Sequence, residues 1–481
     1  MARENHHVVP NTRAGAACPF RAALMAGLVA TLLGPAAGVH PTWDISGAPN
    51  PCDHSQTAHP CGFRPLQAGD AVHGEVYRAA AEHGTYNHAA MIDFHDGFFL
   101  VTWKNAPRDE EQPGQRVLYA TSDDGIFWTP TDGTNVLFPN VSTTAQPAHL
   151  FAAPSVVLEG RRYAVATYSQ YSIHPSPLPE TLLLRRVYPD KSLGEVFWAT
   201  DSPPAEYLPG AAAKGIRLLR TMDGQAQSDA ALLRDPAYLP CGYTHSLKCE
   251  AIVGEGIPKH ESAHWHIPGS QKEVAMFRHR GSNHPFQWMH RDDPAGSWSG
   301  LLSNSNFPDH GSNLNAGTLP SGATYVLSNA CPKSWAPRRD PLVVSLSRNG
   351  FSFTKARAIT TCHNAALAGC EPRFPGSHKD AGPSYPQGVT VVGTDHLDGL
   401  YVVFTNNKED VWVVKIPYSA LELSEEEEGE KAAASGGEEG QDRDSPGWLE
   451  ESLCAAGQWL GWMGAASWGE AASRLASAAR W

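Results

Sequence analysis

The chain has 481 residues, with 44 glycines and 38 prolines, and only 18% of its residues are charged. Many short elements joined by Gly, Pro, Asn and Asp turns give this profile, so an all-β fold is favoured over a helical one. Residues 425–444 hold nine acidic and two basic residues, so they carry −7 of the formal net charge of −13. No basic surface for gripping a nucleic acid is visible, so we expect no nucleic-acid partner.

The first 38 residues have the pattern of a targeting segment. Three arginines precede an uncharged apolar run at residues 22–33, and small residues follow it. This order is typical of a secretory signal peptide. The run is shorter than the roughly 20 residues that cross a bilayer. We therefore expect cleavage and a secreted, extracellular or lumenal protein, with a membrane anchor in this segment as the alternative.

Six cysteines form three closely spaced pairs. Each pair lies in turn-rich sequence and can close a small loop as a disulfide in an oxidising compartment. None of the three has CxxC spacing, so a zinc ribbon is not expected. The pairs are Cys52/Cys61, Cys241/Cys249 and Cys362/Cys370.

The composition divides the chain into five parts. After the signal or anchor at residues 1–38, a Pro/His/Cys-rich segment precedes a long region of repeated strand patterns, an acidic linker and a Trp-rich tail. The linker composition is typical of disorder. The apolar spacing of the tail suggests an amphipathic helix, with weak contact to a membrane surface or a partner, or a tail that packs on nothing, as the alternatives. The four later parts are residues 39–70, 71–421, 422–447 and 448–481.

Four strand–turn–strand patterns lie in residues 71–421. They occupy residues 90–103, 154–167, 316–327 and 388–404, and no long helical periodicity separates them. Repeated β-hairpins over this length predict a β-propeller. At roughly 50–60 residues per blade, six or seven blades are expected.

Residues 122–128 and 347–353 share a turn pattern with Ser, then Asp or Asn, then Gly and an aromatic residue. The polar side chains bond turn amides, glycine accepts a positive φ, and the aromatic residue packs between blades. A degraded third copy occupies residues 292–298. The structural residues predicted from the two better copies are Ser122, Asp124, Gly125, Trp128, Ser347, Asn349, Gly350 and Phe353.

These turns resemble the Asp boxes of the sialidase (neuraminidase) superfamily, and the resemblance covers roughly residues 71–421. It implies a glycoside hydrolase that cleaves a terminal or acidic sugar from a glycan. The family order of Glu, Arg, Arg before an Asp box, then Tyr is matched by Glu261, Arg278, Arg339 and Tyr385. The resemblance makes Tyr385 the nucleophile, Glu261 its activating base, and the two arginines the clamp for a substrate carboxylate.

The match departs from the family on the first predicted strand. Asn87 and His88 stand where the family has an arginine, and no general-acid Asp is identifiable, although Asp109 and Glu110 follow in the next loop. Asn87 therefore becomes a candidate binding residue. His88 supports a second hypothesis, a His-dependent lyase or rhamnosidase-type propeller acting on uronate-containing glycans. A third hypothesis is a glycan-binding propeller without catalysis.

Two further interpretations stay open for the residues around Glu261. Glu261 and Arg278 can form a structural ion pair, with Tyr385 as a core aromatic residue. Residues 260–264 also match the HExxH pattern of zinc proteases, but that motif needs a helix, and Pro258 and Pro268 leave no room for one. No metal or other cofactor is expected.

Overall fold

The computed structural model describes residues 41–43 and most of residues 63–423. The N-terminal segment at 1–38, the linker beyond residue 423, the tail at 448–481, and the pairs Cys52/Cys61 and Cys241/Cys249 lie outside the described residues. Within residues 63–423 the gaps are 64, 67–68, 111, 130–133, 141–147, 171–180, 204, 223, 225–226, 229–260, 279–284, 295, 297, 300–302, 309, 332–337, 368 and 394–395.

The described residues form five four-stranded antiparallel sheets. The first contains β3 (Tyr86–His95), β4 (Phe98–Ala106), β5 (Arg116–Ser122) and β6 (Val136–Phe138), and the second β7 (Ala148–Leu158), β8 (Arg161–Gln170), β9 (Thr181–Val187) and β10 (Leu193–Trp198). The third contains β11 (Ser262–His266), β12 (Glu273–Phe277), β13 (Gln287–Arg291) and β14 (Ser303–Asn304), and the fourth β15 (Asn315–Thr318), β16 (Thr324–Ser328), β17 (Leu342–Ser347) and β19 (Lys355–Thr360). The fifth contains β2 (Val72–Tyr77), β20 (Pro383–Val391), β21 (Gly399–Asn406) and β22 (Asp410–Ile416).

The remaining described elements are short. Strands β1 (Thr42–Trp43) and β18 (Ser352–Phe353) pair in parallel. The short helical elements include η1 (Ala205–Tyr207), α2 (Leu208–Ala213), η2 (Leu219–Thr221) and η3 (Tyr418–Leu421). No helix in the described part of the chain is long and apolar enough to cross a membrane.

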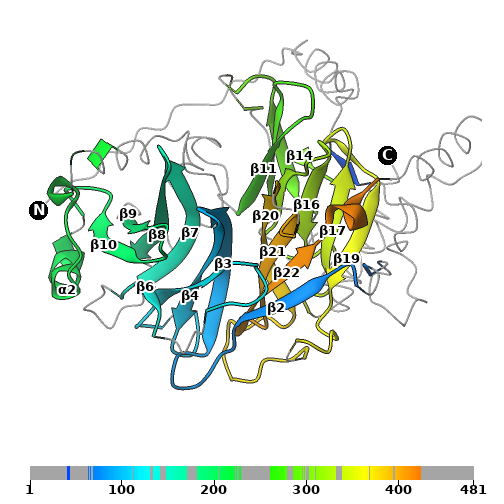
Figure 1. Ribbon diagram of the computed structural model, residues 1–481. Helices are drawn as coiled ribbons and strands as arrows, with labels where there is room; N and C mark the ends of the chain where they lie inside the picture. The colour runs from blue at the N-terminus through cyan, green and yellow to red at the C-terminus, as the bar shows by residue number, and fades with distance from the viewer. Residues whose placement is uncertain are drawn as a thin grey trace, which may run out of the picture. The chain divides into compact units, whose positions relative to one another are not determined.

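Strand β2 joins the two ends of the repeated region. It precedes the first sheet in sequence but pairs with β22 as the outer strand of the fifth, so blue β2 lies beside orange β22 (Figure 1). The other edge strand of the fifth sheet is β20, and β3, β7, β11 and β15 are edge strands of the other four sheets. Strand β20 contacts β3 and β15, β3 contacts β7, and β11 contacts β15. Radial repetition of four-stranded sheets in this way leaves only short, protected edges, as in β-propellers. The fold is therefore an all-β propeller.

The predicted number of blades is wrong, since five four-stranded sheets, and not six or seven, are present in the described residues. The error comes from dividing residues 71–421 evenly. The interval between β10 and β11 adds no strand in its described part, which contains η1, α2 and η2. The four predicted hairpins are confirmed as β3–β4, β7–β8, β15–β16 and β20–β21.

Apolar cores lie between neighbouring sheets. Trp198 packs in the core shared by the first two sheets, and Trp103 in the core between the first and the fifth. Met276 and Val326 belong to the core between the third and fourth sheets. Full burial of a large apolar side chain contributes about 1.5–3 kcal/mol, so these cores hold the sheets together.

The two Asp-box turns have closely similar hydrogen bonds. In the first, Asp124 Oδ1 accepts the amides of Ile126 and Phe127 at 2.9 and 2.8 Å, and in the second Asn349 Oδ1 accepts two amides at the same distances. Ser122 and Ser347 donate to these oxygens. Gly125 has φ +74°, and a Cβ there would lie 2.3 Å from the Tyr401 ring. Phe353 is fully buried and Trp128 partly buried between sheets.

Candidate active site

The strongest cluster of polar side chains brings together Tyr385, Glu261 and Arg278. The Tyr385 hydroxyl donates to Glu261 Oε1 at 2.5 Å, and Arg278 Nη1 lies 2.6 Å from Glu261 Oε2 and 2.8 Å from the Tyr385 oxygen. Glu261 directly precedes β11, Arg278 directly follows β12, and a backbone hydrogen bond of 2.9 Å joins them. The antiparallel pairing of β11 with β12 therefore sets this pair opposite one another, and we call the three residues the catalytic cluster after the role that is proposed for them below.

Backbone irregularities in β20 and β3 lie beside this cluster. Tyr385 has φ +57°, and the register of β20 with β21 shifts between Ser384 and Gln387. Ala89 has φ +53° beside a matching shift in β3 after His88. A positive φ at a residue other than glycine costs on the order of 1 kcal/mol or more. Residues with such strained backbone angles, and β-bulges, are found preferentially at functional sites. Both bulges flank the point where the rings of His88 and Tyr385 meet, with centroids 4.0 Å apart.

The electrostatics of the catalytic cluster favour a neutral phenol beside a carboxylate. Burial raises the pKa of the Tyr385 phenol well above its ordinary value; Arg278 opposes this rise, and the Glu261 carboxylate adds to it. Burial alone would raise the pKa of Glu261, but the Arg278 guanidinium and hydrogen bonds from Arg278 and Tyr385 outweigh it and lower this pKa. Glu261 is therefore ionised at neutral pH and in place to accept the phenolic proton.

Arg339 lies on the other side of the Tyr385 ring. Its guanidinium carbon is 5.2 Å from the ring centroid, and Nη2 donates to the Gly311 carbonyl at 3.1 Å. Its backbone amide donates to Ala381 O at 2.9 Å, and Asn329 Nδ2 donates to its carbonyl at 3.1 Å. The backbone of Arg339 is therefore held by Asn329 and by the segment that leads into β20, and its side chain by the Gly311 carbonyl.

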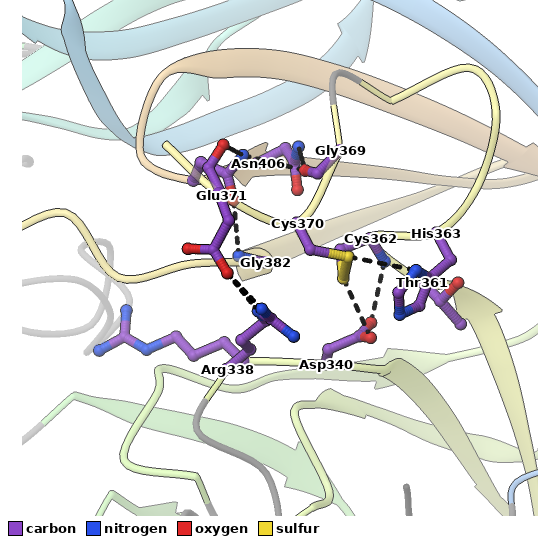
Figure 2. Close-up of a disulfide and its surroundings, with 12 residues drawn as sticks. Arg338, Asp340, Thr361, Cys362, His363, Gly369, Cys370, Glu371, Gly382 and Asn406 are labelled. Carbon is purple, nitrogen blue, oxygen red and sulfur yellow. Dashed lines mark hydrogen bonds and ion pairs between the residues drawn. A yellow bond between two sulfur atoms is a disulfide. The ribbon is translucent and has the colours of Figure 1, made fainter. Parts of the chain in front are cut away.

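The predicted disulfide Cys362–Cys370 is confirmed, and it supports the segment that carries Arg339. Asp340 accepts the Cys362 amide at 3.0 Å, and Arg338 pairs with Glu371 (Figure 2). The residues on either side of Arg339 are thus tied to the loop that this disulfide closes.

Asn87 and His88 differ in what their side chains can offer. Asn87 is fully buried; its Oδ1 accepts from Trp103 and Asn105, and its Nδ2 donates to the Glu409 carbonyl at 2.8 Å. These contacts occupy the amide within the protein, so we leave Asn87 out of the proposed site. His88 is 1% exposed, and burial followed by the charge of Lys408 lowers its pKa well below the ordinary value.

A second group of charges, which the sequence did not indicate as a cluster, borders His88. Lys104 pairs in register with His88 across β3 and β4, and Lys408 lies in the β21–β22 turn. Lys408 Nζ is 2.9 Å from Asp380 Oδ2 and 3.5 Å from Glu110 Oε2, and Asp380 Oδ2 is also 3.0 Å from Arg339 Nη2. We call Lys104, Lys408, Arg339, Glu110 and Asp380 the cationic cluster.

Glu110 and Arg339 of the cationic cluster carry some signal in the sequence, whereas Lys408 and Asp380 do not. Glu110 falls in the loop where a general acid was sought, but there burial is outweighed by Lys408 and Lys104, which lower its pKa well below the ordinary value. Arg339 belongs to the family pattern. Lys408 and Asp380 lie in turn-rich sequence with no motif, and only the fold brings them together.

The last three residues of the zinc-protease pattern lie in a strand. Residues 262–266 form β11, and His264 faces Trp298 and Phe277 at ring distances of 5.7 and 6.4 Å. Ser262 to His264 of the motif therefore lie in a strand and not in the helix that the zinc-protease motif needs, whereas His260 lies outside the described residues.

Fold and site together define a class: an all-β propeller with a Tyr–Glu pair and an arginine bound to both. The family model described as Beta-prop_BT_1020-like, N-terminal beta propeller, matches residues 49–153. No curated protein matches the sequence.

The solved structures that resemble this chain include sialidases. One titled "Sialidase" has a TM-score of 0.59 and 18% identity, covering 79% of this chain and 35% of its own. Trypanosoma rangeli sialidase in complex with sialic acid has a TM-score of 0.42 and 11% identity, covering 73% of this chain and 59% of its own. This chain thus spans about a third of the first structure and three-fifths of the second. The fold is that of the sialidase-type propeller.

Proposed function

We propose that the protein is a glycosidase that releases a terminal acidic sugar from glycans through a covalent intermediate on Tyr385. The observation that carries this proposal is the 2.5 Å hydrogen bond from Tyr385 to Glu261, with Arg278 bound to both. A carboxylate held ionised beside a neutral phenol can take its proton as the phenolic oxygen attacks. The excess of lysine and arginine near Tyr385 favours a substrate with a negative charge.

The reaction has two steps. In the first, the Tyr385 oxygen bonds to the anomeric carbon, Glu261 accepts the phenolic proton, and the glycosidic C–O bond breaks. The leaving oxygen takes a proton from water, because Glu110 and Asp380 have lowered pKa values and are ionised at neutral pH. In the second, Glu261 returns its proton to Tyr385 as water attacks the anomeric carbon, and the second proton of that water passes to solvent. The sugar acid leaves with retained configuration.

The hypothesis of a His-dependent lyase has weaker support. His88 is buried, its Nδ1 lies 3.3 Å from the Thr405 hydroxyl, and its pKa is lowered. It can support the Tyr385 ring, but proton abstraction from a substrate carbon would need access that its burial does not give. Secretion remains a proposal, supported by the disulfide Cys362–Cys370.

The test is turnover on aryl glycosides of sialic acid and of uronic acids, together with natural sialosides and uronate-containing polysaccharides. We expect free sugar acid from at least one class and none from the Tyr385→Phe variant. An unsaturated product absorbing in the ultraviolet would support the lyase instead. Binding on a glycan array without any product would support the non-catalytic propeller and overturn the proposal.

A further inference from the structure

Asp380 occupies the space between two cations beside Tyr385. A single oxygen, Oδ2, lies 3.0 Å from Arg339 Nη2 and 2.9 Å from Lys408 Nζ. Burial would raise the pKa of Asp380, but Arg339 and Lys408 outweigh it and lower this pKa strongly. The geometry is therefore that of a carboxylate bound by a two-cation clamp.

The three members of this arrangement differ in exposure. The side chains of Arg339 and Lys408 are 7% and 6% exposed, whereas that of Asp380 is 44% exposed. Asp380 thus covers both cations from the solvent side. Arg339 Nη1 is buried and has no hydrogen-bond acceptor among the described residues. A buried guanidinium donor left unpaired is costly, and an added acceptor would satisfy it.

The chain on both sides of Asp380 is anchored, which leaves its side chain as the part able to move. Lys379 Nζ pairs with Glu409 at 2.7 Å and donates to the Thr85 carbonyl at 2.9 Å. Asp109 accepts from Ser377 Oγ at 2.8 Å, and Ala381 O accepts the Arg339 amide. A rotation of the Asp380 side chain can therefore uncover the clamp without moving the backbone.

We propose that Arg339 and Lys408 form the site for the substrate's carboxylate, and that Asp380 is an internal competitor that the carboxylate of a sugar acid displaces. The proposal rests on the proposed function and names its specificity: Lys408 supplies a cation on the side where the family arginine is replaced by Asn87 and His88. Asp380 closes the clamp in the free protein. Only a ligand with its own carboxylate can replace both ion pairs, so a neutral sugar gains nothing there.

The test measures binding and does not require turnover. Dissociation constants of N-acetylneuraminate and D-glucuronate, with D-glucose as the neutral probe, are measured by calorimetry or ligand-observed NMR for the full chain. Asp380→Asn should bind at least one sugar acid about tenfold more tightly than the unmodified protein, and Lys408→Met about tenfold more weakly. Asp292→Asn is the matched control, because Asp292 forms an exposed ion pair with Lys272 at 3.1 Å.

A double variant guards against misfolding. Asp380→Asn leaves two buried cations without their shared partner, whereas Asp380→Asn with Lys408→Met removes one charge of each sign. The double variant should fold like the unmodified protein and lose the tenfold gain of the single variant. Unchanged sugar-acid affinity in folded Asp380→Asn, or equal gains for sugar acids and glucose, would overturn the proposal.

Glycosides with different leaving groups distinguish two roles of Asp380, that of an internal competitor and that of a general acid. If Asp380 is a competitor, Asp380→Asn changes kcat/KM by the same factor for aryl and alkyl glycosides of the sugar acid. A selective loss of kcat on alkyl glycosides would instead make Asp380 the proton donor and contradict the proposal. If no glycoside is turned over but the affinity shifts appear, the clamp stands and the proposed function fails.

Discussion

The catalytic cluster and the cationic cluster surround the same tyrosine but are built differently. Glu261 and Arg278 face each other across adjacent strand ends, and they satisfy one another through direct hydrogen bonds with Tyr385. The cationic cluster draws Lys104, Lys408 and Asp380 from separate strands and turns, and one carboxylate oxygen serves two cations. The first arrangement is suited to moving a proton, and the second to holding an anion.

The largest effect should come from the nucleophile. Tyr385→Phe removes the attacking oxygen and should lower kcat by at least about 1,000-fold while leaving sugar-acid affinity within a few-fold of the unmodified protein. Steady-state rates on an aryl glycoside, with circular dichroism to check folding, measure this. Tyr418→Phe, which loses a 2.8 Å hydrogen bond to Val391 O, is the control. A similar loss in both variants would place Tyr385 in a structural role.

Removing the cation of the catalytic cluster should change the pH dependence. Arg278 lowers the pKa of Glu261 against the opposing effect of burial. In Arg278→Met burial acts unopposed by this charge, so the acidic limb of kcat/KM should move to higher pH and activity at neutral pH should fall about 100-fold. Arg217→Met, at an exposed pair with Glu195, should leave the profile in place. An unmoved acidic limb in Arg278→Met would show that Glu261 is not the base.

Removing the disulfide should lower stability and affect the segment that carries Arg339 more than the catalytic cluster. Replacing Cys362 and Cys370 by serine opens a loop with a sequence separation of 8. Loop-closure entropy gives a loss of about 2.5 kcal/mol in the free energy of unfolding. Because the loop binds Asp340 and Arg338, KM for the sugar acid should rise more than kcat falls. Urea unfolding measures the free energy of unfolding, and steady-state kinetics measure kcat and KM. A fall in kcat with an unchanged KM would contradict the prediction.

The smallest effect concerns His88. Its folded-state pKa is lowered, so below about pH 6.5 the unfolded chain takes up a proton that the folded protein excludes. The contribution of neutral His88 to the free energy of unfolding is therefore present above that pH. It is lost as the pH falls, by up to about 1.4 kcal/mol per pH unit. His88→Gln should lose less stability than the unmodified protein between pH 8 and 5.5 in urea unfolding. Parallel curves would mean that His88 takes up a proton in the folded protein as readily as in the unfolded chain, which would contradict the lowered pKa.

The sequence predicted the hairpins and the catalytic cluster better than the rest. Alternation of apolar residues and Gly-containing turns is local, so strands such as β3 and β4 follow from it. Glu261, Arg278, Arg339 and Tyr385 follow from their order in a resembling family.

The blade number and the cationic cluster depend on long-range pairing. The pairing of β2 with β22 and the approach of Lys408 to Asp380 join residues without any shared local pattern. Asn87 was selected because it replaces an arginine in the family pattern, and the sequence could not show that Trp103 and Asn105 would occupy its amide oxygen.

The central claim is that Tyr385 acts on a sugar whose carboxylate the cationic cluster binds. The most direct measurement compares kcat/KM for an aryl glycoside of a sugar acid with kcat/KM for its carboxamide counterpart, across sialic and uronic acids. Loss of a charge bound by two largely buried cations should lower kcat/KM at least about 100-fold for the carboxamide. Equal rates on the acid and the carboxamide, or turnover of neither by folded protein, would contradict the account.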